Sequence, residues 1–370
     1  MRKIVLVVMI VFLVLGITVS AFGQGSITVN PEIPDIEVID EDIYGNKAVS
    51  VKELELTPED IEKIKEGNYT AALAMHYTGT DYMRANIEGL KDTFKKMGVE
   101  VIATTDAQFS AEQQISQVET LLAQSPDVIV AVPVEAGATS RVFQQAANMG
   151  VKLVFMDGLA ANMKPGEDYI SAGTGDNAGL GTQAAHLLAE KLNEQGKVGV
   201  VFHDADFHVT QQRSDAFEKT IAEEYPDMEV IARGGIQNAN DGEQVASAML
   251  TRYPNLDGMF VVWDVPAEGA AAAAKSMGRE DLIITTTDLG KPAALEIANE
   301  RNIQALAAQL PYDQGIAEAI LAGYGLLGKE DIPPYVTAPA LPVTKDNLLE
   351  SWKLVYREEA PEEIKEALNK

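Results

Sequence analysis

The sequence predicts an α/β protein built from two consecutive units, each with a parallel sheet that helices cover on both faces. Short, wholly apolar segments alternate with longer amphipathic segments from residue 69 onward. The apolar segments lack a polar alternation, which is typical of parallel strands buried on both faces. The alternation pauses after residue 156 and restarts at residue 177, which indicates two units in succession.

The first unit begins at Tyr69 and places helices between its strands. We expect strands at 70–75, 99–104, 127–132 and 151–156, and helices at 83–97, 111–124 and 138–149. Gly98 and Gly150 directly follow two of these helices. The left-handed conformation that ends many helices favours glycine, so both helix ends are well marked.

The second unit repeats the pattern. We expect helices at 177–192, 212–223, 243–251, 266–277, 292–299 and 312–327, and strands at 197–202, 229–233, 258–262, 282–286 and 304–309. The segment 173–178 before it has the spacing of a dinucleotide-binding loop, but Asp176 places a negative charge where a pyrophosphate would bind. We therefore interpret this segment as a hinge turn in which Asp176 or Asn177 caps the next helix.

Two different segments precede Tyr69. Residues 1–23 have the three parts of a secretory signal peptide, with a basic start, an apolar run at 4–19 and small residues that allow cleavage after Ala21 or Gly23. An uncleaved membrane anchor is the alternative. Residues 24–68 are acidic, contain prolines and show little periodicity, so we expect an extended tether. It ends in a short helix that Thr57 and Pro58 open.

Composition and missing motifs exclude several classes of function. The 370 residues carry 29 Lys and Arg against 56 Asp and Glu, so the acidic surface disfavours nucleic acid. The chain has no cysteine, which excludes disulfides, thiolate metal sites and a lipoprotein anchor. No zinc-protease, Walker or hydrolase-elbow motif is present, and the loop 238–242 lacks the glutamate of a calcium loop. We expect no metal, no cofactor and no catalysis.

Ligands of open parallel sheets bind at the carboxyl ends of the strands. The residues that follow the expected strands are polar or aromatic, and aspartate recurs among them. They include His76, Asp157, Trp263, Asp264, Asp288 and Gln309. These aspartates could alternatively be helix caps.

The order of elements and five motifs resemble type I periplasmic binding proteins of the ribose-binding group, from about residue 69 to residue 343. The motifs are the strand 71–75, the strand-Asp turn 154–157, the segment 173–177, the segment 212–217 and the run 309–315. The resemblance implies two Rossmann-like lobes, each a doubly wound parallel sheet, joined by three crossover segments. Lobe one would comprise 69–174 plus 310–337, and lobe two 175–309 plus 338–370. Such lobes close by hinge motion around a ligand.

The resemblance implies capture of a neutral sugar or polyol for the permease of an ABC importer, by a monomer in the periplasm or outside the cell. The implied ligand residues are His76, Thr80, Asp81, Tyr82, Met83, Asp157, Gln211, Gln237, Trp263, Asp264, Asp288 and Gln309. Carboxylates and amides suit sugar hydroxyls, which both donate and accept, and aromatic rings at Tyr82, Trp263 or Phe207 can stack on a sugar face.

Two departures from the ribose-type pattern narrow the ligand. Gly158 stands where these members carry an arginine directly after the aspartate, and Gln211 stands at a second arginine position. We therefore expect a pocket without a fixed cation. This favours an uncharged pentose-like or modified sugar or an alditol, with ribose one candidate and an amine-bearing ligand another. A sensory binding module or a secreted sugar-processing hydrolase with two acidic residues remains an alternative.

Overall fold

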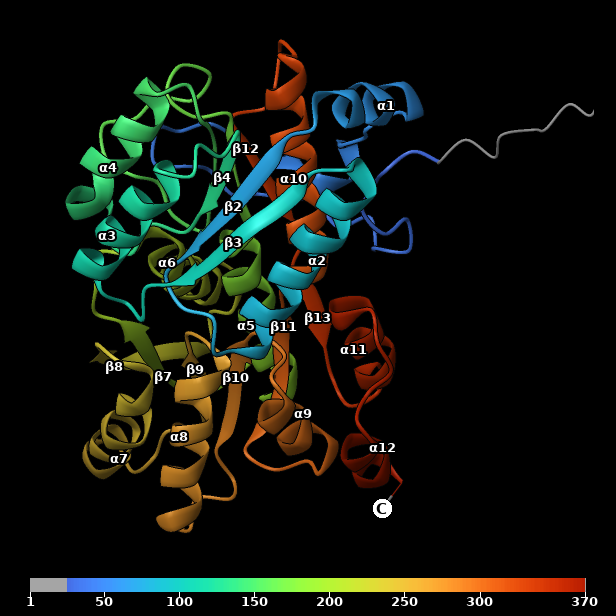
Figure 1. Ribbon diagram of the computed structural model, residues 1–370. Coiled ribbons are helices and arrows are strands. Elements are labelled where there is room, and N and C mark those ends of the chain that lie inside the picture. The colour runs from blue at the N-terminus through green and yellow to red at the C-terminus, as the bar shows by residue number, and fades with distance from the viewer. Residues whose placement is uncertain (1–24, 370) are drawn as a thin grey trace, which may run out of the picture.

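The computed structural model describes residues 25–369, so the expected signal peptide at 1–23 lies outside the described residues. Two sheets lie one above the other, each with helices on both sides (Figure 1). The chain crosses between them three times, after β6, after β11 and after β12. The predicted α/β class, with two sheets and three crossings, is confirmed. Among the described residues, no helix combines the length and apolar character that a membrane span requires.

The first sheet, the core of lobe one, has the strand order β1-β12-β6-β5-β4-β2-β3, and all its pairs are parallel. Its strands are β1 (Val49–Ser50), β2 (Thr70–Met75), β3 (Glu100–Asp106), β4 (Val128–Ala131), β5 (Lys152–Met156), β6 (Ser171–Gly175) and β12 (Tyr335–Ala338). Its helices are α1 (Pro58–Gly67), α2 (Asp81–Met97), α3 (Ala111–Leu122), α4 (Ala136–Asn148) and α10 (Pro311–Leu327).

Alternate residues of these strands face opposite layers of helices. Leu73 and Val130 belong to the buried cluster that includes side chains of α2 and α10. Their neighbours Ala72 and Ile129 belong to the cluster with α3 and α4. Because both faces are covered, the strands are apolar without alternation, as the sequence analysis expects.

The second sheet, the core of lobe two, has the order β13-β11-β10-β9-β7-β8, and only β13 pairs antiparallel. Its strands are β7 (Gly196–His203), β8 (Met228–Ile236), β9 (Gly258–Val261), β10 (Ile283–Thr287), β11 (Ile303–Ala308) and β13 (Leu341–Val343). Its helices are α5 (Asn177–Lys191), α6 (His208–Glu224), α7 (Gly242–Arg252), α8 (Asp264–Ser276), α9 (Lys291–Ala298), α11 (Leu348–Tyr356) and α12 (Glu362–Leu368).

Several local details agree with the sequence and several do not. Asp176 caps α5, because its carboxylate accepts the N–H of Gly179 at 3.1 Å, and Thr57 caps α1 as predicted. Strand β6 was not predicted, because it consists of small residues and serine and threonine rather than an apolar run. Helix α6 begins at His208, four residues before the predicted start at 212.

Residues 25–56 do not form the expected extended tether. Ile27 and Leu56 exchange backbone hydrogen bonds of 2.9 and 3.0 Å, and both side chains are buried in the main core cluster with Val51 and Leu54. The short strand β1 pairs parallel with β12 at the edge of the first sheet. The apolar anchors are irregularly spaced, so no periodicity announces them in the sequence.

Candidate ligand-binding cleft

Two aspartates mark the strand ends where the lobes meet. Asp157 follows β5 of lobe one and Asp288 follows β10 of lobe two. Both have a positive φ, 56° and 69°, a conformation in which aspartate is enriched among residues other than glycine. Hydrogen bonds from neighbouring side chains hold each carboxylate in place, so the two turns present their aspartates in fixed positions at the ends of the sheets.

In lobe one, neutral hydroxyl groups surround the Asp157 carboxylate. The Thr174 hydroxyl donates to its Oδ1 at 2.6 Å, and the Tyr82 hydroxyl donates to its Oδ2 at 3.0 Å. Burial raises the pKa of Asp157, although the bond from Thr174 lowers it. Burial also raises the pKa of Tyr82 well above its ordinary value, so its hydroxyl stays protonated and donates.

In lobe two, a cation and an amide surround Asp288. The Arg213 guanidinium lies 3.3 Å from Asp288 Oδ2, and the Gln309 side-chain amide donates to Oδ1 at 2.7 Å. Arg213 is only 5 % exposed and also donates to Asn177 Oδ1 at 2.9 Å. The Asp288 carboxylate is therefore held on both oxygens.

Asp264 completes the acidic lining at the first residue of α8. Its carboxylate accepts the N–H of Val265 at 2.8 Å. Burial raises the pKa of Asp264 well above its ordinary value, and the neighbouring carboxylates of Asp288 and Glu268 raise it further. A proton on the Asp264 carboxyl group, or a ligand group that donates a hydrogen bond to it, therefore stabilises the site.

These residues form one group across the two lobes. Besides burial, the pKa of Asp157 responds to Arg213, which lowers it, and to Asp288, which raises it, although both belong to lobe two. We call Tyr82, Asp157, Asp264, Asp288 and Gln309 the cleft cluster. All five are among the residues that the sequence analysis assigned to a ligand.

The expectation of a pocket without a fixed cation is wrong, because Arg213 contacts Asp288. Residues two apart on a helix point about 200° apart. Gln211 therefore faces outward and is exposed, while Arg213 is buried against Thr287 and Asp288. Asp288 pairs with this cation, so Arg213 does not stand free to bind an anionic ligand.

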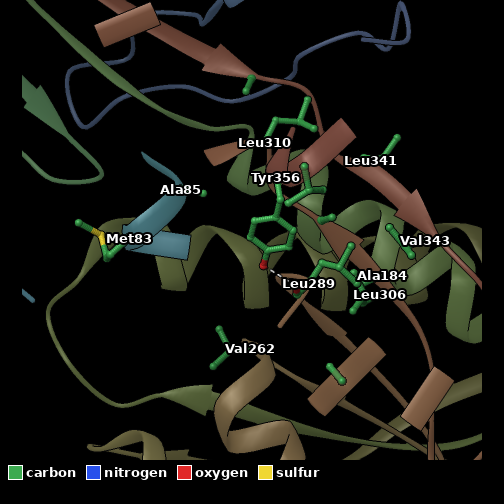
Figure 2. Close-up of a cluster of buried hydrophobic side chains, with 14 of the residues drawn as sticks. Met83, Ala85, Ala184, Val262, Leu289, Leu306, Leu310, Leu341, Val343 and Tyr356 are labelled. Atoms are coloured by element: carbon green, nitrogen blue, oxygen red, sulfur yellow. Dashed lines mark hydrogen bonds between the residues drawn. The ribbon is translucent and has the colours of Figure 1, made fainter. Parts of the chain in front are cut away.

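Four predicted residues lie between the end of β2 and the first turn of α2. Among the described residues, no group hydrogen-bonds the buried Nδ1 of His76, and burial lowers the pKa of this imidazole to about 4. Thr80 caps α2, and Asp81 lies 3.4 Å from the Arg84 guanidinium. Met83 is 2 % exposed and lies in a cluster of buried apolar residues with Leu289 and Tyr356 (Figure 2).

Two of the three other predicted residues of lobe two lie beside its outer strands β7 and β8, and Trp263 follows the central strand β9. Gln211 and Gln237 are exposed; the side-chain amide of Gln211 donates to the carbonyl of Ala205, and the backbone N–H of Gln237 donates to the carboxylate of Asp241. Gln211 lines a hollow of about 490 Å³ at the ends of β7 and β8. The Trp263 ring meets His203 edge-on at 5.2 Å. The structure does not bring the two glutamines to the cleft cluster.

The lobes touch at Gly158. A Cβ at this position would lie 3.5 Å from Cε2 of Phe207, which precedes α6 of lobe two. A side chain at this position would therefore start in ordinary van der Waals contact with the Phe207 ring.

Sequence reasoning missed the contribution of the C-terminal helix α11. The Tyr356 hydroxyl donates to the carbonyl of Leu289, the residue after Asp288, as the dashed line in Figure 2 shows. The Tyr356 ring also packs on Trp352, with ring centroids 4.5 Å apart. This contact supports the turn that carries Asp288. No helix was predicted over residues 348–356, and no motif there pointed to this role.

Comparison with known proteins assigns residues 70–330 to the family described as periplasmic binding protein domain. The chain is 28 % identical over 244 residues to the ribose import binding protein of Bacillus subtilis, an alignment that covers 66 % of this chain and 77 % of the relative. It is 24 % identical over 287 residues to the xylitol-binding protein of Mycolicibacterium smegmatis, with 74 % and 76 % covered.

Solved structures give the same picture. A solute-binding protein from Actinobacillus succinogenes, solved with bound D-allose, superposes with a TM-score of 0.67 at 26 % identity. The match covers 99 % of that chain but 76 % of this one, so this chain carries segments that the neighbour lacks. In the part of the chain that is described, no group of three or more His, Asp or Glu side chains is placed to hold a metal.

Proposed function

The chain belongs to the periplasmic binding protein family, and we propose that it captures a neutral sugar or polyol in the cleft between its lobes and delivers it to the permease of an ABC importer. The named relatives, which bind ribose, xylitol and D-allose, support this proposal. They are binding proteins, so we propose no catalytic role. We also propose that the protein works as a monomer outside the cytoplasm.

The cleft cluster is the observation that carries the proposal. Burial raises the pKa of Asp157 and Asp264, so a ligand that donates hydrogen bonds to these carboxyl groups stabilises their ionised form. Sugar and alditol hydroxyls supply many donors and can also accept from the second N–H of the Gln309 amide, whose first N–H donates to Asp288. Because a buried partner left without a bond is costly, this arrangement selects ligands by their hydroxyl pattern.

The charge of the cleft supports an uncharged ligand over an anionic one. Arg213 is paired with Asp288, and Asp157 and Asp264 add two further carboxyl groups, each with a pKa that burial raises. A sugar acid or sugar phosphate would meet these carboxylates without a free cation in return. An aminated sugar is the one charged class that fits.

A binding screen tests the proposal. Purified protein is heated with D-ribose, L-arabinose, D-apiose, D-allose, xylitol, myo-inositol, glucosamine and ribose 5-phosphate, and hits are titrated by calorimetry. We expect a neutral member to stabilise the fold, by about 2.7 kcal/mol at a hundredfold excess over its Kd. The Asp264→Ala variant, which leaves no cation unpaired, should lose this shift. A shift with the phosphate alone would refute the proposal.

A further inference from the structure

A buried aspartate of the N-terminal extension lies at the first crossing between the lobes. Asp40 is 1 % exposed and belongs to residues 25–69, which precede the part of the chain that matches the family. Its Oδ2 accepts the N–H of Asn177 at 3.0 Å and the hydroxyl of Tyr335 at 2.8 Å. Its Oδ1 accepts the side-chain amide of Gln212 on α6. Asp40 therefore joins the extension to both lobes.

The position of Asp40 follows from the start of helix α5. Asn177 is the first residue of this helix, and the first N–H groups of a helix have no carbonyl partner within it. The positive end of the helix also favours a negative charge. The Asp40 carboxylate meets both requirements from outside the helix, which fixes it against Asn177.

Asn177 divides the hydrogen-bond network into two branches. Its side-chain oxygen accepts from Arg213 Nε at 2.9 Å, and its side-chain nitrogen donates to Thr174 Oγ1 at 3.2 Å. Arg213 continues to Asp288 of the cleft cluster, and Thr174 continues to Asp157. Asn177, which is 0 % exposed, is therefore connected by hydrogen bonds, through Arg213 and Thr174, to the proposed ligand carboxylates of both lobes.

We propose that Asp40 is a positioning residue of the ligand site. It holds Asn177, and Asn177 sets Arg213 against Asp288 and Thr174 against Asp157. The inference rests on the proposed function of the cleft, and it assigns a role in binding to an extension that lies outside the family match. The competing role is a purely structural one, in which Asp40 only fastens the extension to the lobes.

A matched pair of variants separates the two roles. Asp42 lies in the same extension, is 7 % exposed, and accepts its hydrogen bonds within a local turn, from Tyr44 and Asn46. Asp40→Asn and Asp42→Asn each remove one carboxylate charge. We expect Asp40→Asn to weaken calorimetric binding of the tightest ligand of the panel by about tenfold, as for loss of a charge-assisted hydrogen bond. Asp42→Asn should lower the unfolding midpoint but leave the Kd within about twofold.

Unchanged affinity in Asp40→Asn, or equal weakening in Asp42→Asn, would overturn the proposal. A second readout needs no ligand, because the Arg213 Nε–H resonance in a proton–nitrogen NMR spectrum should shift in Asp40→Asn and stay in place in Asp42→Asn. If no sugar or polyol binds the wild type, the proposed function is refuted, but the Arg213 Nε–H resonance still tests whether Asp40 positions Arg213. Should Asp40→Asn not fold, Tyr335→Phe removes one bond to the same carboxylate and should shift the same resonance; an unmoved resonance would refute the proposal.

Discussion

The two lobes hold their cleft aspartates in different ways. Asp157 of lobe one accepts from two neutral hydroxyls, whereas Asp288 of lobe two contacts a buried guanidinium and an amide. The charge of Asp288 is thus balanced by a guanidinium that it contacts. Burial disfavours the charge of Asp157, which its two hydroxyl partners, the more distant Arg213 and any donor of a bound ligand stabilise. We therefore propose that Asp288 supports both the fold and binding, whereas Asp157 serves mainly binding.

Removing the balanced carboxylate should have the largest effect. Asp288→Ala leaves the buried Arg213 without its carboxylate, and breaking a buried ion pair costs about 3 kcal/mol of unfolding free energy. Sugar binding should be lost as well. Urea denaturation and calorimetry measure the two losses. A variant as stable as the wild type would show that Arg213 does not depend on Asp288.

The lobe-one aspartate should respond differently. Asp157→Asn keeps the shape of the side chain, and the hydroxyls of Tyr82 and Thr174 can reorient toward the new amide. We expect the free energy of unfolding to fall by about 1 kcal/mol while the Kd for the panel ligand rises about tenfold. Equal losses of stability in Asp157→Asn and Asp288→Ala would remove the contrast between the lobes.

The crossing between the lobes adds a pH dependence. Burial raises the pKa of Asp176 to about 7, above the ordinary value of 3.8, so the folded state binds this proton more tightly than the unfolded state. Its stabilising contribution is complete below pH 3.8 and is lost as the pH rises toward about 7. Asp176→Asn should make the fall in unfolding free energy over this window shallower, by at most about 1.4 kcal/mol per pH unit. Urea denaturation from pH 4 to pH 8 measures the slope, and parallel curves for the two proteins would contradict the assignment.

Much of the fold could be predicted because its signals are local. The apolar runs of β2, β4 and β5 and the caps at Thr57 and Asp176 lie within a few residues of the elements they define. Strand β6 escaped notice because its small residues are buried by packing rather than by hydrophobicity. Topology placed Asp157, Asp264 and Asp288 at the strand ends, so the acidic part of the cleft cluster was also predictable.

The rest of the site depends on contacts between distant segments. Arg213 was missed because the start of α6 sets which of its side chains face inward, and that start lies four residues earlier than the apolar pattern suggests. Asp40 was missed because its partners Asn177, Gln212 and Tyr335 are more than 100 residues away in the chain. No periodicity within residues 25–56 announces such contacts.

The smallest change that tests the contrast between the lobes removes one hydroxyl. Tyr82→Phe takes a donor from Asp157 but keeps the aromatic ring. Since Thr174 still donates to Asp157, we expect a loss of about 0.5–1 kcal/mol in binding, or roughly threefold in Kd, with little change in stability. Calorimetry with the panel ligand measures this effect, and the same substitution combined with Asp157→Asn should add nothing further. If the two losses were additive, the Tyr82 hydroxyl would act directly on the ligand and not through Asp157.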